Sequence, residues 1–107
     1  MATKETNLSN AIMVALSDAG CLVFRNNTGV LPGPGGRPVK FGLCNGGADL
    51  ICIGPDGVFT AVEVKTPTGR VSPAQTAFIA AVRRHGGRAG VARSVEDALA
   101  LAFPPPG

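Results

Sequence analysis

Residues 47–65 read Gly-Ala-Asp-Leu-Ile-Cys-Ile-Gly-Pro-Asp-Gly-Val-Phe-Thr-Ala-Val-Glu-Val-Lys, and the rest of the chain is arranged around them. Two runs rich in apolar and β-branched residues, 47–53 and 59–65, flank the Gly-Pro-Asp-Gly sequence of a turn. This pattern predicts a β-hairpin. Most of each strand is apolar on both faces, which is typical of strands in the middle of a layered domain.

Three charged residues interrupt this apolar pattern at one end of the predicted hairpin. Asp49 lies at the start of the first strand, and Glu63 and Lys65 lie at the end of the second. These two ends lie side by side in an antiparallel hairpin, and residues two apart share a face of a strand. We therefore expect two carboxylates and one ammonium to converge. Because burying charge is costly unless the charge is paired or holds a metal, the cluster indicates a metal-dependent phosphodiesterase site.

Phosphodiester hydrolysis needs a hard divalent cation, because an anionic nucleophile must approach an anionic phosphate. Mg²⁺ prefers one or two carboxylates together with other oxygen ligands, so Asp49, Glu63 and the backbone carbonyl of Val64 are candidate ligands. Lys65 is then a candidate for orienting the attacking water and stabilising charge on the phosphate oxygens. The alternative is a structural ion pair of Lys65 with either carboxylate, and the spacing alone does not separate the two readings.

Length and composition predict one domain over residues 1–107, with an adequate core. Ten Lys and Arg against seven Asp and Glu give a net charge of +3, which suits an anionic partner. With no Trp or Tyr in the chain, stacking of bases on such rings is excluded as the way of holding a nucleic acid. We expect a cytoplasmic protein without a membrane segment, because no signal peptide and no apolar run of roughly 20 residues is present.

Outside the hairpin, the chain predicts three helices and two further strands. Helical spacing of apolar residues, start signals at Ser72-Pro73 and Ser94, and glycine stops define the helices. The predicted ranges are helix 6–19, strand 21–24, helix 73–85, strand 89–92 and helix 95–103. The resulting order, α-β-β-β-α-β-α, predicts an α/β fold in which helices flank a mixed β-sheet.

Two segments carry additional expectations. Residues 26–47 are rich in Gly and Pro and predict a long flexible loop, which we expect to act as a flap over the site. The final helix is more apolar than one buried stripe requires. We therefore expect it to form the surface of a dimer, although the core of the domain could use it fully.

The order of the charged residues is similar to a known signature. Asp49 followed fourteen residues later by Glu63-Val64-Lys65 resembles the Asp…Glu-x-Lys motif of the PD-(D/E)xK nuclease superfamily. The surroundings, Gly46-Gly47-Ala48-Asp49-Leu50 and the run from Glu63 through Ser72-Pro73-Ala74-Gln75, resemble the VRR-NUC family in its small stand-alone phage and bacterial form. The resemblance extends from about Glu5 to the final helix. Ala48 stands where the superfamily name has Pro.

The resemblance implies a restriction-endonuclease-like fold and a Mg²⁺- or Mn²⁺-dependent DNA endonuclease. It implies a homodimer that acts on branched DNA in the manner of Holliday-junction resolvases, in the cytoplasm of a bacterium or a phage-infected host. Asp49 and Glu63 match the metal ligands of the family, and Lys65 matches its catalytic lysine. The alternatives are a non-catalytic nucleic-acid-binding module and a structural subunit of a phage or repair assembly.

The resemblance also assigns two further residues to the site. Glu5 matches an acidic residue that family members bring to the metal, although an acid in the first turn of a helix also interacts favourably with the helix dipole. Gln75 matches the glutamine of the family motif, although it also completes a capping box with Ser72. Four basic residues are candidate contacts to DNA phosphates, namely Arg25, Arg37, Lys40 and Arg70. The alternative for each is a solvated surface charge.

Overall fold

The structure, a computed structural model, describes residues 3–26, 29–41 and 47–106, with the backbone alone at residues 29, 30, 40 and 41. Its elements are α1 (Lys4–Asp18), β1 (Leu22–Arg25), β2 (Gly29–Pro32), the 3-10 helix η1 (Pro34–Gly36), β3 (Pro38–Phe41), β4 (Leu50–Ile53), β5 (Phe59–Val64), α2 (Pro73–Arg84), β6 (Arg88–Ala92) and α3 (Val95–Ala102). Four strands form a mixed sheet in the order β1-β4-β5-β6, in which only β5 and β6 are parallel. The predicted α/β class is confirmed.

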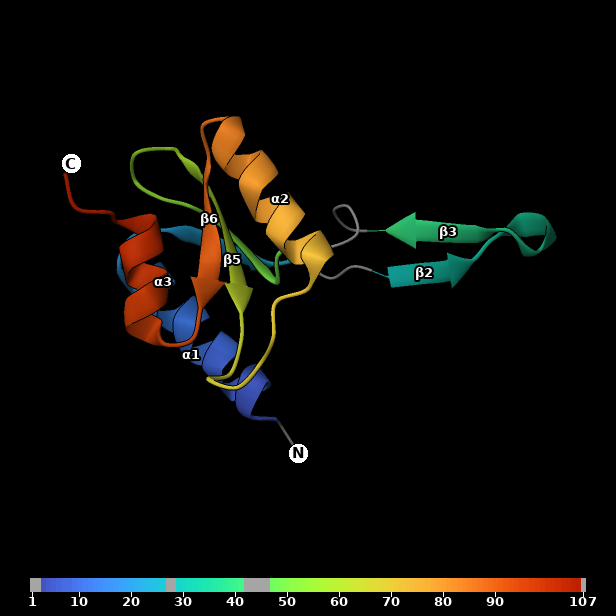
Figure 1. The fold of residues 1–107 in the computed structure, drawn as a ribbon, viewed down its shortest axis with the longest axis horizontal. Coiled ribbons are helices and arrows are strands. Elements are labelled where there is room, and N and C mark those ends of the chain that lie inside the picture. Colours follow the sequence, from blue (N-terminus) through green and yellow to red (C-terminus); the bar gives the residue numbers. More distant parts are fainter. Residues whose placement is uncertain (1–2, 27–28, 42–46, 107) are drawn as a thin grey trace.

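Helices cover both faces of this sheet (Figure 1). α1 and α3 pack on one face, where Ile12 and Leu16 meet Val62 and Val64 of β5 in the larger apolar cluster. On the other face, Ile79 of α2 belongs to a smaller cluster with side chains of β4, β5 and β6. Because successive side chains of a strand alternate between faces, Glu63 points to the α2 side of the sheet.

Side-chain caps fix where the helices begin. The hydroxyl oxygens of Thr3, Ser72 and Ser94 accept hydrogen bonds from backbone N–H groups three residues later, as N-cap residues do. α1 and α2 are followed by Gly20 and Gly86, whose φ angles of 97° and 89° lie in the left-handed region that favours glycine. The start signals and the glycine stops of the sequence therefore act where they were expected.

The apolar residues of α3 are used by the core of the domain. Ala98 and Ala102 are buried, and Val95, Leu99 and Leu101 pack against the larger apolar cluster. These five residues are therefore used by the core rather than by a dimer surface, whereas Phe103 at the end of the helix is 42% exposed. No helix in the described part of the chain has the length and hydropathy needed to cross a membrane.

Residues 29–41 correct the prediction of a long flexible loop and flap over residues 26–47, of which residues 27–28 and 42–46 lie outside the described part. β2 and β3 form an antiparallel hairpin that projects away from the rest of the molecule (Figure 1). Leu31 pairs with Val39 across this hairpin. At its tip, Gly35 and Gly36 have φ angles of 69° and 78°. The Gly and Pro content that suggests a loop therefore serves the tight reversal of a hairpin.

Replacing residues 29–41 by a short Gly-Ser linker should leave the four-stranded sheet folded. The hairpin lies outside that sheet, and none of its described side chains belongs to either apolar cluster. We expect a melting temperature within about 4 °C of the intact chain, which corresponds to less than about 1 kcal/mol. Leu16→Ala, which removes a fully buried side chain, serves as the positive control and should cost about 2–5 kcal/mol. A loss of stability as large as that of the control would contradict this placement of the hairpin.

Candidate active site

The structure brings Asp49, Glu63 and Lys65 together at one end of the β4–β5 pair. Leu50 of β4 lies opposite Val62 of β5, so Asp49 and Glu63 are the next residues beyond this pair. The Oδ2 atom of Asp49 accepts a hydrogen bond of 2.9 Å from the backbone N–H of Val64. The Nζ atom of Lys65 lies 3.8 Å from Oε1 of Glu63. The antiparallel hairpin thus produces the convergence of charge that its sequence predicts.

The carboxyl group of Glu63 is the most constrained member of this cluster. The residue is only 2% exposed, and its Oε1 atom accepts a hydrogen bond of 2.8 Å from Nε2 of Gln75. Its Oε2 atom is buried and has no hydrogen-bond partner among the described residues. Burial, followed by the neighbouring Asp49 carboxylate, raises the pKa of Glu63 to about 8, although the Lys65 ammonium acts in the opposite direction.

Gln75 both caps α2 and reaches the site. Its backbone N–H donates to Oγ of Ser72 at 3.1 Å, and its Oε1 atom accepts from the backbone N–H of Ser72 at 2.8 Å. These two bonds complete a capping box. The amide nitrogen of the side chain is then left to donate to Glu63. The two readings of Gln75 are therefore compatible, and the start of α2 is tied to the end of β5.

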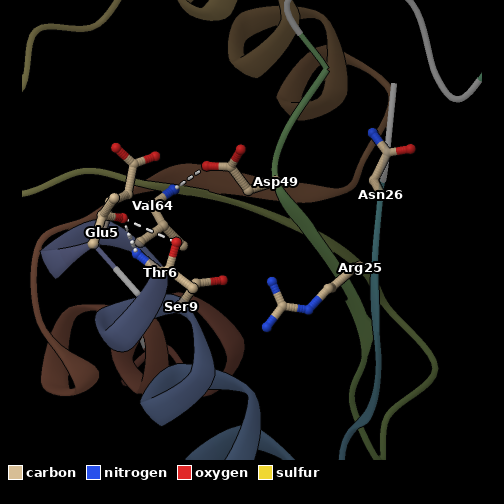
Figure 2. A pocket seen from close by; sticks show the side chains of 8 residues that line it. Glu5, Thr6, Ser9, Arg25, Asn26, Asp49 and Val64 are labelled. Atoms are coloured by element: carbon tan, nitrogen blue, oxygen red, sulfur yellow. Dashed lines mark hydrogen bonds between the residues drawn. The ribbon is translucent and has the colours of Figure 1, made fainter. Parts of the chain in front are cut away.

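A pocket of about 290 Å³ opens beside Asp49 and brings together residues that are far apart in the sequence. Glu5 from α1, Arg25 from the end of β1, and Val64 also line it. Figure 2 shows Glu5, with Thr6 and Ser9, on one side of the pocket and Arg25, Asn26 and Asp49 on the other. The guanidinium of Arg25 donates to Oδ1 of Asn10 in α1. Glu5 thus shares this pocket with Asp49, and its charge also contributes, as the smallest of the causes, to the raised pKa of Glu63.

The acidic pair fits a hard divalent cation. Within residues 3–26, 29–41 and 47–106, no three His, Cys, Asp or Glu side chains are close enough to form a metal-binding group. Mg²⁺ does not require such a group, because it commonly binds one or two carboxylates and completes its shell with water and substrate oxygens. The unpartnered Oε2 of Glu63 is the kind of oxygen that a cation would bind. Asp49 and Glu63 are the residues present that would hold it.

The predicted phosphate contacts lie in different parts of the structure. Arg25 lines the acidic pocket, Arg37 ends the tip of the β2–β3 hairpin, and Arg70 is exposed in the segment before α2. Lys40 belongs to β3, and its side chain lies outside what the structure describes. The described three therefore do not form one cluster.

Two residues near the site were not identified from the sequence. Asn26 donates from its backbone N–H to the carbonyl of Asp49 at 2.9 Å and from Nδ2 to the carbonyl of Ala48 at 3.0 Å. Arg93 donates to backbone carbonyls of the turn that follows Lys65. Both act on backbone groups, which leave no pattern in the sequence. A polar residue directly after a strand is the only signal that could have pointed to them.

Comparison with known proteins identifies similar domains. The family model of the VRR-NUC domain matches residues 35–96. A solved structure described as a VRR_NUC domain is 28% identical in sequence, with a TM-score of 0.65 over 91% of each chain. No curated protein matches this chain. The matched range of the family model contains Asp49, Glu63, Lys65 and Gln75, whereas Glu5 and Arg25 precede it.

The raised pKa of Glu63 predicts how stability depends on pH in the metal-free protein. The unfolded chain releases this proton near pH 4.5, whereas the folded chain keeps it up to about pH 8. Stability should therefore fall as the pH rises between these values. The amide of Glu63→Gln does not ionise in this range. The melting temperature of the variant minus that of the wild type should therefore be larger at pH 8 than at pH 5. Each unit of pKa shift is worth 1.36 kcal/mol, so we expect a gain of at least about 4 °C.

The melting temperatures are measured in EDTA, which keeps the protein free of metal, and Glu96→Gln is the matched control. Glu96 is exposed in the first turn of α3, so the same chemical change there should shift the melting temperature equally at pH 5 and pH 8. Parallel stability curves for the wild type and Glu63→Gln would contradict the assignment of a retained proton to Glu63.

Proposed function

This chain belongs to the VRR-NUC domain family, a nuclease-type module, and on that premise we propose that it is a Mg²⁺- or Mn²⁺-dependent DNA endonuclease. The observation that carries the proposal is the buried Oε2 of Glu63, which has no hydrogen-bond partner in the described part of the chain. A carboxylate with a purely structural role would normally have its buried oxygens satisfied by donors. An oxygen that lacks a donor and lies beside a second carboxylate, with which Glu63 can only share a proton, instead supports a role as a ligand.

Each residue of the cluster has a role in this proposal. Asp49 and Glu63, with the carbonyl of Val64, would hold the cation, which supplies the positive charge that phosphodiester hydrolysis needs. Gln75 keeps the Glu63 carboxyl group oriented through its bond to Oε1. The side chain of Lys65 is 17% exposed, so its ammonium can reach a phosphate at the surface and stabilise charge that develops there. Glu5 adds a further acid to the lining of the pocket.

We propose that Arg25, Arg37, Lys40 and Arg70 contact DNA phosphates. The net charge of the chain is +3, and contacts of this kind position a nuclease without reading bases. Arg37 lies on the projecting hairpin, which therefore extends the surface available to DNA (Figure 1). Affinity should consequently fall as the salt concentration rises.

The preferred substrate in this proposal is branched DNA, cut by a homodimer. A four-way junction requires two symmetric cuts, and two identical sites related by a two-fold axis provide them. The surface also has an apolar region that α3 does not supply. Leu22, Phe24 and Phe59 are 63%, 44% and 39% exposed. Leu22 and Phe59 both pair with Ile53, so these side chains lie on one face of the sheet. Exposed apolar regions of this kind favour association.

A non-catalytic DNA-binding module is the alternative function. One observation favours it, namely that Lys65 lies within ion-pair distance of Glu63 and could serve only to neutralise it. The variants described next separate the two functions, since a binding module would retain DNA affinity and lack any metal-dependent cleavage.

Glu63→Gln and Asp49→Asn should each abolish metal-dependent cleavage while the protein stays folded. The amide retains the shape of the carboxylate but not its charge, so the cation loses a ligand. The measurement is the incubation of labelled linear, flap and four-way DNAs with Mg²⁺, Mn²⁺ or EDTA, with Glu96→Gln as the matched control. Undiminished nicking by purified Glu63→Gln would remove Glu63 from the mechanism.

Lys65→Ala should reduce the single-turnover rate by about 10²–10³-fold, the loss expected for one electrostatic donor at a transition state. Its affinity for DNA should change little, because the other basic residues remain. Thermal melting on the same preparation supplies the control. If Lys65 only neutralises Glu63, stability should fall and the cleavage rate of the folded fraction should be unchanged.

The protein should be a dimer at micromolar concentration and should bind a four-way junction more tightly than a linear duplex of equal length. Light scattering that gives twice the mass of one chain, together with gel shifts of the two DNAs, checks both statements. Phe24→Lys places a charge on the exposed apolar face and should shift the mass toward the monomer. A monomer that cuts linear and branched DNA equally well would restrict the function to that of a general nuclease.

A further inference from the structure

We infer that Arg93 is a positioning residue for Lys65, because its guanidinium clamps the turn formed by residues 66–69 against the lysine side chain. The inference rests on the proposed function, since it takes Lys65 to be the catalytic lysine. It assigns a role to a residue between β6 and α3, which belongs neither to the cluster of acids nor to the predicted phosphate contacts.

The guanidinium of Arg93 holds two carbonyls of this turn. Its Nη1 atom lies 2.6 Å from the carbonyl oxygen of Thr66 and 2.8 Å from that of Gly69, and 3.4 Å from that of Pro67. Nη1 carries two hydrogens, so the two short contacts are the full hydrogen bonds. The carbonyl of Thr66 also accepts from the N–H of Gly69 at 3.0 Å, which closes the turn. Both ends of the turn are therefore bound by one side chain.

The same turn lies against the side chain of Lys65. A Cβ atom placed on Gly69 would be only 3.3 Å from Cδ of Lys65, so the backbone of Gly69 runs alongside the aliphatic stem of the lysine. The backbone of Lys65 is itself fixed, because its N–H donates to the carbonyl of Ala92 at 3.1 Å. The position of the ammonium group then depends on the stem, and the stem is confined by the turn.

Arg93 is a rigid anchor for this clamp. It follows β6 directly, and its backbone N–H donates to Oδ2 of Asp97 at 2.9 Å. Asp97 in turn donates its backbone N–H to the Ser94 cap of α3 at 3.1 Å. A lysine side chain has many rotamers, and a displacement of about 1 Å in a catalytic group can cost about 10²-fold in rate. A fixed turn beside the stem limits this freedom before substrate binds.

Arg88, the first residue of β6, provides a matched control. It lies at the opposite end of β6, where its guanidinium donates to the carbonyl of Ala102 at 3.0 Å and pairs with Asp56 at 2.7 Å. Like Arg93, Arg88 therefore binds a backbone carbonyl through its guanidinium, but at the end of the sheet away from Glu63. Arg93→Lys and Arg88→Lys keep the positive charge and replace a fork with a single ammonium.

The first test is hydrogen exchange of the Gly69 amide in protein free of metal and DNA. We expect exchange at least about 10-fold faster in Arg93→Lys, because the turn opens locally, and exchange within about 2-fold of the wild type in Arg88→Lys. Unchanged protection of Gly69 in Arg93→Lys overturns the inference. This readout is independent of whether the protein cuts DNA.

The second test is cleavage in single turnover. Arg93→Lys should lower the rate by about 10-fold or more while the dissociation constant for DNA stays within about 2-fold, and Arg88→Lys should leave both unchanged. In a Lys65→Ala background, Arg93→Lys should cause no further loss, because the residue acts through Lys65. A further loss in that background, or a normal rate in Arg93→Lys, overturns the inference. A wild type that cuts no DNA overturns the proposed function instead.

Gly69→Ala is a second variant that tests the inference if Arg93→Lys does not fold. The added methyl group would lie 3.3 Å from both Cδ of Lys65 and Oγ1 of Thr66 and 3.4 Å from the carbonyl oxygen of Thr66, while the Arg93 side chain stays intact. We expect this variant to lower the rate and to leave DNA affinity unchanged, again with no further loss in the Lys65→Ala background. A wild-type rate in Gly69→Ala contradicts a role of the turn in placing the lysine.

Discussion

The carboxyl group of Glu63 is buried at the end of β5 with one oxygen bound to Gln75 and the other without a partner in the described structure. A charge in that position is unfavourable, and the neighbouring Asp49 makes it more so. Both effects raise the pKa of Glu63 to about 8 and so favour its protonated form in the absence of a cation. Above about pH 5 the acidic end of the sheet should therefore lower the stability of the metal-free protein, a trade-off that is common at functional sites.

Several elements end at this point, and each contributes a connection to it. β5 supplies Glu63, and Lys65 follows it directly. Gln75, which also completes the capping box of α2, binds the Glu63 carboxyl group. Asn26 connects the end of β1 to the backbone of Asp49. Arg93 connects β6 to the turn after Lys65. The side chains of the site are thus held by backbone contacts of the scaffold, which is the arrangement that keeps reactive groups in place before substrate binds.

The sequence predicts the centre of the molecule better than its periphery. Strand periodicity and charge placement are local, so the β4–β5 hairpin, its charged end and the order of helices around it follow from residues 47–65 and the caps. The β2–β3 hairpin was missed because Gly and Pro serve both loops and tight turns. The role of Arg93 could not be predicted, since its partners are carbonyls of residues more than 20 positions away.

Calorimetric titration of Mn²⁺ into the metal-free protein at pH 7, without DNA, tests the central claim most directly. The acidic pair should bind the ion saturably, and repeating the titration in buffers of different ionisation enthalpy should show release of a proton, because Glu63 has a pKa of about 8. Glu63→Gln should lose both the binding and the proton release, whereas Glu96→Gln should retain them. Equal binding of Mn²⁺ by Glu63→Gln and the wild type, or no binding by the wild type, would contradict the account.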